Sequence, residues 1–364
     1  MARLRLRIAV ILAGFALGLC ARLARAQNPG PGFVLQGEGG LVTVLVLDPS
    51  SPSTVFASTA RGIYRSADSG AHWESRNRGL EDQSVLALAV DPASHGTLYA
   101  TTDTGGVYKS SDGGNRWTSA NQGLASRYVG VVAAQGRALY AGTGGGRIFR
   151  SVDAAATWAE LTPPTTRVAV TAIAVDPSEA VIYAGTNGEG VFRSSDGGST
   201  WMHAAAPLSR GTVWDLVIDP TSSSTLYAAT YDGLFRSDDA GANWKGLHKS
   251  LKSGNVLALA IDPAEPKTLY AGTAVGICKS LDSGSSWAML NTGLFVSAIS
   301  LDPGAPSVLY AGTHLGVLKS VDAGATWSPL RLAPDSVPPD GNPMPPEKLP
   351  QAPVRAASVT SSPR

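Results

Sequence analysis

Short apolar runs alternate with polar turn segments along most of the chain, and the alternation repeats about every 43 residues. One repeat contains VLALAV at Val85–Val90, LYAT at 98–101 and VYKS at 107–110, and a further piece begins at Trp117. The runs are rich in β-branched and aromatic residues and are bounded by Gly, Pro, Asp or Ser, as strands are. The pattern therefore predicts four short strands in every repeat.

Each repeat carries the signature S-x-D-x-G-x-x-W. Six copies are complete, and a seventh copy around Asp153 has Ala155 in place of Gly. The tryptophans lie 44, 41, 43, 43, 43 and 40 residues apart. Seven repeats of four strands are typical of a β-propeller, whose radially arranged sheets protect most strand edges. The sequence therefore predicts an all-β fold, a seven-bladed β-propeller of four-stranded antiparallel blades.

The signature can be explained as a tight turn between the third and fourth strands. Asp accepts hydrogen bonds from backbone N–H groups, Ser adds another, and Gly permits a positive φ where the chain reverses. The tryptophan then buries a large ring between neighbouring blades. Calcium binding is the alternative, but the turn lacks the paired acidic positions of an EF-hand loop. The aspartates of the seven turns are Asp68, Asp112, Asp153, Asp196, Asp239, Asp282 and Asp322.

At these residues the chain resembles the Asp-box (BNR) repeat family, over roughly residues 33–330. Members of that family include sialidases, xyloglucan-cleaving glycosidases, sortilin-type receptor ectodomains and the photosystem II assembly factor. In length and repeat number the chain looks most like the assembly factor-like and sortilin-type propellers. The resemblance implies that the seven Asp-box aspartates are structural, away from the binding surface, and a scaffold alone assigns no activity.

The two ends of the chain differ from the repeats. Residues 1–26 combine an arginine-rich start, an apolar run at 8–21 and a small-x-small site, which predicts a secretory signal peptide cleaved after Ala26. The alternatives are an uncleaved anchor helix, for which 14 apolar residues are short, and a lipoprotein signal at Cys20. Residues 331–364 are proline-rich and predict a disordered tail, which leaves residues 27–330 for the propeller. We expect a secreted or periplasmic protein with no membrane span after cleavage.

Composition narrows the classes of function. The formal net charge is +1, and the loss of five arginines with the signal peptide leaves −4, which argues against nucleic-acid binding. Cleavage also leaves Cys278 as the single cysteine, so no intrachain disulfide is expected. The histidines show no zinc-ligand spacing. We therefore expect a monomer without cofactor or metal.

Antiparallel strand order places alternate loops on opposite faces of such a propeller. The Asp-Pro turns share one face with the Asp-boxes, and the loops after the second strands share the other face with the inter-blade linkers. Charged and aromatic residues that the repeat does not explain fall on this second face. The candidate binding residues are Arg78, Asp103, Arg127, Tyr128, Glu189, Arg210, Trp214, Asp215, Tyr231, Asp232 and His314. No catalytic residue is assigned.

The pair Trp214-Asp215 departs most clearly from the repeat. Asp215 occupies a slot in the first strand that holds Ala in other repeats, and a carboxylate there costs free energy unless it is paired or hydrated. One interpretation is a ligand contact or acid at the channel mouth, and the other is a salt bridge to Arg210 or Arg167. Cys278 replaces an aromatic residue and is predicted to be a small buried apolar side chain.

Two classes of function fit these observations. The first is an exported, non-enzymatic binding or assembly scaffold with a protein or carbohydrate partner. The second is a sialidase-like or xyloglucanase-like glycoside hydrolase, which needs two facing carboxylates or a tyrosine nucleophile. The resemblance favours the first, because the Arg-Ile-Pro motif of sialidases is absent and xyloglucan-cleaving relatives use two propellers. Asp103, Glu189, Asp215 and Asp232 are the candidate acids. The sequence leaves open whether the segment 33–35 or the segment from Trp327 closes the ring.

Overall fold

The computed structural model describes residues 40–161, 167–204, 206–208, 210–247, 251, 254–330 and 332. The predicted signal peptide, the segment 33–35 and all of the predicted tail except Leu332 lie outside these residues. The described part contains strands and turns but no helix, and therefore no helix long and apolar enough to cross a membrane.

The strands follow one another in repeated sets of four, and we call each set a four-strand unit. The first units are β1 (Val42–Asp48), β2 (Ser51–Thr59), β3 (Gly62–Ser66), β4 (Glu74–Ser75); β5 (Val85–Val90), β6 (Leu98–Thr102), β7 (Gly106–Ser110), β8 (Thr118–Ser119); and β9 (Val129–Gln135), β10 (Ala138–Thr143), β11 (Ile148–Ser151), β12 (Ala159–Glu160). The next are β13 (Val170–Val175), β14 (Ile182–Gly188), β15 (Val191–Ser194), β16 (Met202–His203); and β17 (Gly211–Asp219), β18 (Ser222–Thr230), β19 (Gly233–Ser237), β20 (Lys245–Gly246). The last are β21 (Val256–Ile261), β22 (Leu269–Thr273), β23 (Gly276–Ser280), β24 (Ala288–Thr292); and β25 (Val296–Asp302), β26 (Ala305–Thr313), β27 (Gly316–Ser320), β28 (Ser328–Leu330).

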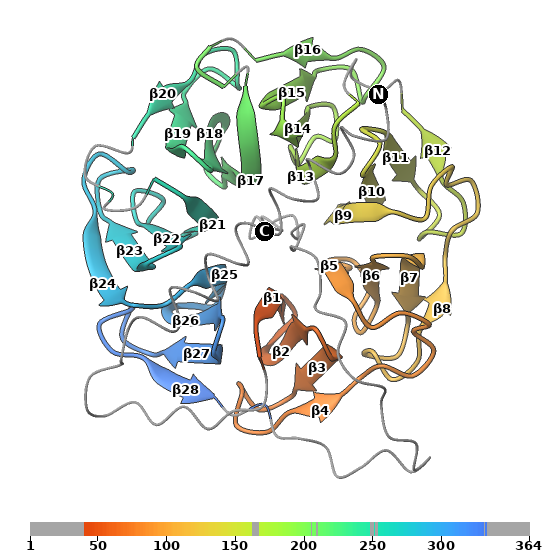
Figure 1. The fold of residues 1–364 in the computed structure, drawn as a ribbon, viewed down its shortest axis with the longest axis horizontal. Coiled ribbons are helices and arrows are strands. Elements are labelled where there is room, and N and C mark those ends of the chain that lie inside the picture. Colours follow the sequence, from red (N-terminus) through yellow and green to blue (C-terminus); the bar gives the residue numbers. More distant parts are fainter. Residues whose placement is uncertain are drawn as a thin grey trace, which may run out of the picture.

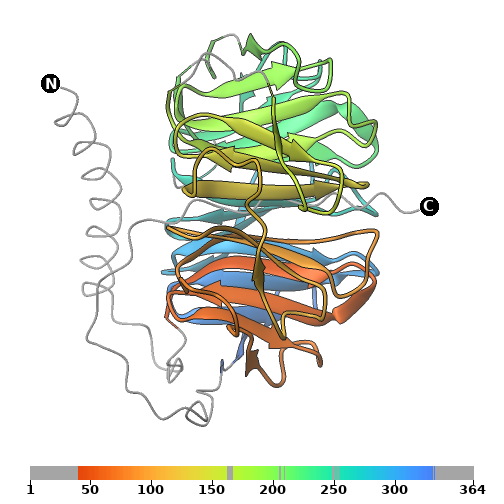
Figure 2. The same cartoon turned by 90° about the vertical axis from the view of Figure 1, so that its right-hand side faces the viewer.

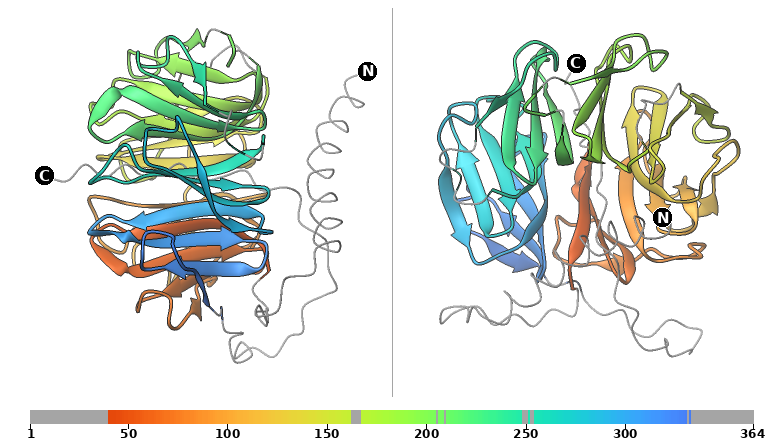
Figure 3. Two further views of the ribbon diagram at one scale, coloured as in Figure 1. Left: turned by 90° about the vertical axis from the view of Figure 1, so that its left-hand side faces the viewer. Right: turned by 45° about the horizontal axis from the view of Figure 1, so that its top comes forward.

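The units form a β-propeller (Figure 1). Five units are separate four-stranded antiparallel sheets, and β13–β16 and β17–β20 are joined into one eight-stranded sheet. That junction is small, because β14 and β17 pair only through Asn187–Thr212 and Gly188–Gly211. The first strand of each unit lies nearest the centre and the fourth lies at the rim (Figure 1). Seen from the side, the strands run between two opposite faces (Figures 2 and 3).

Backbone hydrogen bonds identify which loops share a face. The N–H that follows the last Thr of a second strand donates to a carbonyl at or just before the start of the first strand of the same unit, as from Asp103 to Ser84 at 3.0 Å and from Tyr231 to Thr212 at 3.1 Å. The Asp-box turns instead donate to the connection between first and second strands, as from Gly113 to Gly96 at 2.8 Å. We call the first side the linker face and the second the Asp-box face.

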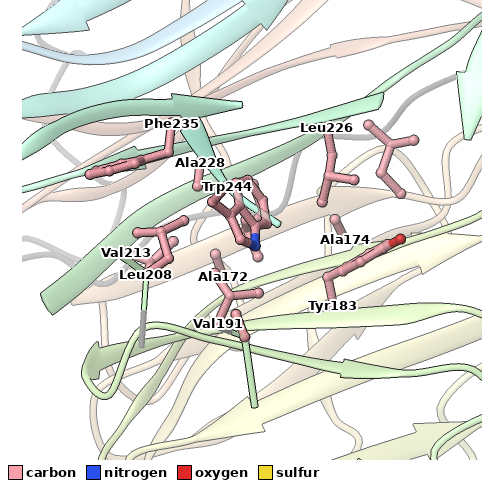
Figure 4. Packing of buried hydrophobic residues seen from close by; sticks show 13 residues of the cluster. Ala172, Ala174, Tyr183, Val191, Leu208, Val213, Leu226, Ala228, Phe235 and Trp244 are labelled. Carbon is pink, nitrogen blue, oxygen red and sulfur yellow. The ribbon is translucent and has the colours of Figure 1, made fainter. Parts of the chain in front are cut away.

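The apolar core lies between neighbouring units. One cluster combines Ala172 and Tyr183 of β13–β16 with Leu226, Phe235 and Trp244 of β17–β20, and all five are buried (Figure 4). Burial of a Leu or Phe side chain contributes about 1.5–3 kcal/mol. Because every unit buries its faces against its neighbours, stability comes from nearest-neighbour interfaces around the ring.

The seven Asp-box turns have one geometry. In the first, the Ser66 hydroxyl donates to Asp68 Oδ1 at 2.8 Å and accepts from the Gly70 N–H at 2.8 Å, and Asp68 Oδ1 also accepts from the His72 N–H at 2.8 Å. In four turns, hydrogen bonds from the side chain and backbone of the residue four positions later help to lower the pKa of the aspartate to about 2. These aspartates are Asp153, Asp196, Asp239 and Asp322. The fourth strand begins one residue after each tryptophan.

The ring closes by packing of the last unit on the first. β28 pairs with β27, so the segment that follows Trp327 forms the outermost strand of the last unit. Across the closure, the Tyr310 hydroxyl and the Lys319 ammonium donate to the Ser69 carbonyl at 3.2 and 3.0 Å. Within the described residues, the sheet of the last unit is therefore complete without a strand from the start of the chain.

Candidate functional site

The linker face gathers eight of the predicted residues, together with Asp82, into two clusters on different units. The first, the Asp82–Tyr128 cluster, contains Asp82, Asp103, Arg127 and Tyr128 from the units β5–β8 and β9–β12. The second, the β14–β17 junction cluster, contains Glu189, Arg210, Trp214, Tyr231 and Asp232. Both lie on loops or strand ends, which sequence variation alters most easily without damage to the sheets.

Asp82 holds the first cluster in place. Its Oδ1 accepts from the Ser84 N–H at 2.8 Å, and its Oδ2 accepts from the N–H and the hydroxyl of Thr104, both at 2.9 Å. The carboxylate therefore ties the linker before β5 to the loop between β6 and β7. It is fully engaged by donors, which suits a structural role better than a chemical one.

The Asp103 carboxyl group of this cluster makes no hydrogen bond with a described residue. Burial raises the pKa of Asp103, and the negative charge of Asp82 raises it further. A neighbouring carboxylate and partial desolvation are the two conditions that favour a protonated acid. Asp103 is therefore the described residue of the linker face best suited to general-acid chemistry.

Tyr128 presents an aromatic ring beside Asp103. Its side chain is 42% exposed, and burial of the remainder together with the charge of Asp103 raises the pKa of the Tyr128 phenol. The ring lies against Gly144, where a Cβ would come within 1.9 Å of Tyr128 Cδ1. Arg127 is exposed, and its guanidinium donates to the Gly105 carbonyl at 3.3 Å.

The junction cluster forms where β14 reaches β17. The Thr212 hydroxyl donates to Asn187 Oδ1 at 2.9 Å, and Glu189 forms a parallel bridge with Gly211. Arg210 and Asp232 are exposed on either side of this pairing, and Tyr231 is 60% exposed. The cluster offers charge of both signs next to an aromatic ring on one face.

Trp214 occupies a β-bulge that recurs in every first strand. The register shifts at Thr43, Leu86, Gly130, Thr171, Trp214, Leu257 and Ser297. A bulge leaves one residue unpaired and redirects its side chain. The Trp214 indole N–H donates to Asn255 Oδ1 of the next unit at 3.1 Å, so the half-buried ring bridges two units near the centre.

Asp215 links two first strands through its carboxylate. It is only 7% exposed, and it accepts from the Leu216 N–H at 2.9 Å and from the Leu259 N–H of β21 at 3.0 Å. Charge-assisted bonds to backbone N–H groups stabilise a buried carboxylate. This geometry explains why Asp is accommodated where other repeats have Ala.

The remaining candidates are more isolated. Arg78 is exposed near the rim, where its carbonyl accepts from the Trp117 N–H at 2.9 Å. His314 is half-buried, and its Nδ1 accepts from the Phe295 N–H at 3.1 Å. Cys278 is buried, with its sulfur 3.6 Å from that of Met289. No group of three His, Cys, Asp or Glu residues in the described part of the chain is placed to hold a metal ion.

Sequence reasoning did not select several residues that shape the two clusters. Ser84, Thr212 and Asn255 occupy one repeat position, at or just before the start of the first strand, and their carbonyls accept from the N–H groups of Asp103, Tyr231 and Ala274. Their position in the repeat could have identified them, because each comes directly before a valine at or near the start of a first strand. Asn187 follows Thr186 near the end of the second strand β14, and its N–H donates to the Ala169 carbonyl at 2.9 Å.

Comparisons with known proteins agree on the fold. A family model described as the DUF6242 beta propeller domain matches residues 53–174. No curated protein sequence matches the chain. Two similar structures are the GH74 enzyme of Niastella koreensis (21% identity, TM-score 0.68) and the GH74 xyloglucanase of Xanthomonas campestris (22%, 0.67). They cover 80% and 81% of this chain, which spans only 54% of each of theirs.

A third similar structure is YCF48 bound to a D1 peptide, with 17% identity and a TM-score of 0.62. The match covers 81% of this chain and 97% of that one. Similarity at these identities extends to the fold and not to an activity. The comparisons and the strand topology together show that the chain is a β-propeller.

Proposed function

We propose that the protein is an exported, non-enzymatic propeller that binds a protein partner through its linker face. The observation that carries this proposal is that the two exposed tyrosines of the described residues, Tyr128 at 42% and Tyr231 at 60%, both lie on this face, whereas the exposed apolar side chains of the Asp-box turns, such as Leu281 and Val321, are aliphatic. Tyrosines supply rigid, amphipathic contact area and are enriched in protein interfaces. The likeness to a propeller that binds a D1 peptide supports a peptide-like partner, and a carbohydrate partner fits the same aromatic surface.

The proposal includes the finer architecture and the location. Each four-strand unit counts as one blade, which makes the propeller seven-bladed, because the two units of the eight-stranded sheet share only two residue pairs. The equal geometry of the turns supports Asp-box repeats. Export rests on the sequence of residues 1–26, and the intact mass of protein from the cell envelope tests cleavage after Ala26.

The test of the binding function is capture of partners from envelope extracts. Tyr128→Ala and Tyr231→Ala together remove aromatic area from the linker face, and loss of a partner that the wild type captures is expected. Leu281→Ala and Val321→Ala remove exposed apolar side chains from the Asp-box face and serve as the matched control. If the tyrosine variant still captures the partner and the Leu281→Ala, Val321→Ala control does not, the interface lies on the Asp-box face and the proposal is refuted.

A glycoside hydrolase is the second candidate, favoured by Asp103 beside Asp82 and by the likeness to GH74 enzymes. In such enzymes one carboxyl group with a raised pKa protonates the leaving oxygen while a second acts as base or nucleophile. Asp82 is a weak candidate for the second role, because three donors already engage it. Turnover of xyloglucan or fluorogenic sialosides that Asp103→Asn abolishes would replace the binding proposal with this one.

A further inference from the structure

The chain leaves its last described strand on the linker face. β28 runs antiparallel to β27 and ends at Leu330, which lies opposite Val317. Val317 is close to the loop between β26 and β27, where the His314 N–H donates to the Phe295 carbonyl at 3.1 Å. This contact is of the kind that defines the linker face, so the residues that follow Leu330 begin on that face.

Leu332 fixes the point from which the chain continues. Its side chain is 4% exposed and belongs to the buried cluster that also contains Val42, at the start of β1, and Val317. Leu332 therefore lies where the last unit meets the first, near the linker-face ends of their strands. Residues 333–364 are attached at this point.

The composition of the attached residues indicates what kind of surface they can bind. Residues 334–353, which we call the proline-rich segment, contain eight prolines. Two stretches within it, 343–346 and 350–353, have the spacing P-x-x-P. Such sequences favour the polyproline II conformation, and surfaces lined by aromatic side chains recognise it. The proline-rich segment therefore calls for exposed aromatic rings as its binding partner.

The linker face supplies such rings in Tyr128 and Tyr231, which are 42% and 60% exposed. A Cβ on Gly144 would lie 1.9 Å from Tyr128 Cδ1, whereas a Cβ on Gly145 would meet nothing within 4 Å. The Gly144 backbone therefore supports one side of the Tyr128 ring, and no side chain fills the space beside it. A supported aromatic ring with open space next to it suits a flat, rigid ligand such as a run of prolines.

The charges of the two parts are complementary. Arg127 and Arg210 are exposed on the linker face, and neither forms an ion pair with a described residue. The proline-rich segment carries three acidic residues and one basic residue. Exposed ion pairs add only about 0.2–1 kcal/mol each, but they orient a bound segment.

The proline-rich segment is long enough to reach both tyrosines. Strands lie about 4.8 Å apart, so a face of two four-strand units across a central opening measures on the order of 50 Å. A polyproline II chain advances about 3.1 Å per residue, which places Pro343 up to about 34 Å from Leu332. Pro353 can lie about 30 Å farther along. Both P-x-x-P stretches can therefore lie over the linker face.

We propose that the proline-rich segment binds the linker face of its own chain, with prolines packed on Tyr128 and Tyr231 and carboxylates directed toward Arg127 and Arg210. A tethered segment has an effective concentration on the order of 1 mM. A surface that binds the free segment with a Kd of about 0.1 mM is then about 90% occupied by it, which weakens binding of a competing partner by roughly tenfold. This competition rests on the binding function proposed above, whereas the contact within the chain does not.

A spin label on the proline-rich segment tests the contact without any partner. With the signal peptide removed, Cys278 is the remaining cysteine and is 2% exposed, so Asn342→Cys supplies the accessible thiol. Gln351→Cys places a second label in the other P-x-x-P stretch. The label should broaden the amide NMR signals of residues 127–128 and 231–232 much more than those of the Asp-box turns.

Substitutions on either side of the contact should reduce this broadening. Tenfold weaker binding lowers the occupancy from about 90% to about 50%. This reduction is expected at residues 127 and 232 for Tyr128→Ala with Tyr231→Ala, and equally for serine at positions 343, 345 and 346.

The matched controls change the same kinds of residue elsewhere. Pro363→Ser lies outside the proline-rich segment, and Leu281→Ala with Val321→Ala lies on the Asp-box face, so both should leave the broadening unchanged. Equal thermal unfolding midpoints for the variants exclude unfolding as the cause. Equal broadening on the two faces, or broadening that the tyrosine substitutions do not alter, overturns the proposal.

The outcome is separable from that of partner capture. If the tyrosines are needed for the contact within the chain but not for capture, the proposed binding function fails and this contact stands. If they are needed for capture while the label broadens no signal on the linker face, the binding function stands and this contact is refuted.

Discussion

Gly70 offers a direct test of how the ring is closed. It lies in the Asp-box turn of the first unit with φ +93°, and a Cβ there would lie 2.3 Å from Leu330 Cδ1 of the last unit. Gly114 occupies the same turn position in the second unit with φ +85°, but the atom nearest to its Cβ would be Arg76 Cβ at 3.4 Å. Substitution by Ala therefore causes similar backbone strain at the two sites, but the new methyl group clashes with a neighbour only at Gly70.

The expected cost follows from these contacts. An L-residue with left-handed backbone conformation costs about 1–2 kcal/mol, and the lower entropy of the unfolded chain offsets about 0.5–1 kcal/mol of it. Gly114→Ala should therefore destabilise by about 1 kcal/mol. Gly70→Ala adds overpacking of about 1–3 kcal/mol. The partly buried Leu330 side chain can move to another rotamer and avoid the clash. The overpacking cost of Gly70→Ala therefore cannot exceed the free energy that Leu330 packing contributes, and we expect a value in the lower half of the range of about 1–3 kcal/mol.

The chain contains a natural precedent for this difference. Ala155 occupies the glycine position of the turn at Asp153, with φ +66°. The residue of the preceding unit that corresponds to Leu330 is Ala120, and the Trp158 indole donates to the Ala120 carbonyl at 2.8 Å. A methyl group is thus accommodated where the neighbouring unit leaves space.

Urea unfolding of the wild type, Gly70→Ala, Gly114→Ala, Leu330→Ala and the double variant Gly70→Ala with Leu330→Ala measures these terms. The free energies of Gly70→Ala and Leu330→Ala should be non-additive, with the double variant about 1–2 kcal/mol more stable than their sum predicts. Equal destabilisation by the two glycine substitutions, or strict additivity at Gly70 and Leu330, would refute the reasoning that this contact closes the ring.

Three further predictions concern stability. Thr101→Val should stabilise by about 1 kcal/mol, because the buried Thr101 hydroxyl has no hydrogen-bond partner among the described residues. Thr230→Val is its control and should destabilise in thermal unfolding, since that hydroxyl donates to the Gly233 carbonyl at 2.8 Å. Asp215→Asn should cost about 1–3 kcal/mol, because an amide replaces one of two acceptor oxygens, and an unchanged urea midpoint would contradict the link between β17 and β21. Burial lowers the pKa of His314, so stability should be fully present above the unfolded value of about 6.5 and fall as the pH drops below it. His314→Gln should flatten that part of the unfolding free energy against pH, and an unaltered slope would exclude His314 as its source.

Much of the fold could be predicted from local pattern. VLALAV at Val85–Val90 forms β5 with the expected limits, and the aspartate and glycine of the complete signatures form the expected turn, as Asp112 and Gly114 do. Prediction of the fourth strand was less accurate, because it begins one residue after the tryptophan and is often only two residues long. Its end depends on the linker that leaves for the next unit, which a short apolar run does not encode.

Prediction of the candidate site was partial for a related reason. The sequence indicated that Asp103 and Tyr128 share a face, because loop position follows from strand order. It could not indicate that Asp82 fastens the loop of Asp103, or that Asp215 accepts an N–H from Leu259. The partner in each case lies in a different segment, and its distance depends on how the sheets pack.

The sequence by itself therefore determined the repeat, the strands and the turn chemistry, because each depends on residues within a few positions of one another. The tertiary structure decided which units touch and how well. It joined β14 to β17, placed Leu330 over Gly70, and left Lys109 without the carbonyl that its counterpart Lys279 contacts. These differences arise because nearly identical repeats must close one ring. A missing loop or a changed side chain in one repeat therefore changes the contacts between that unit and the next.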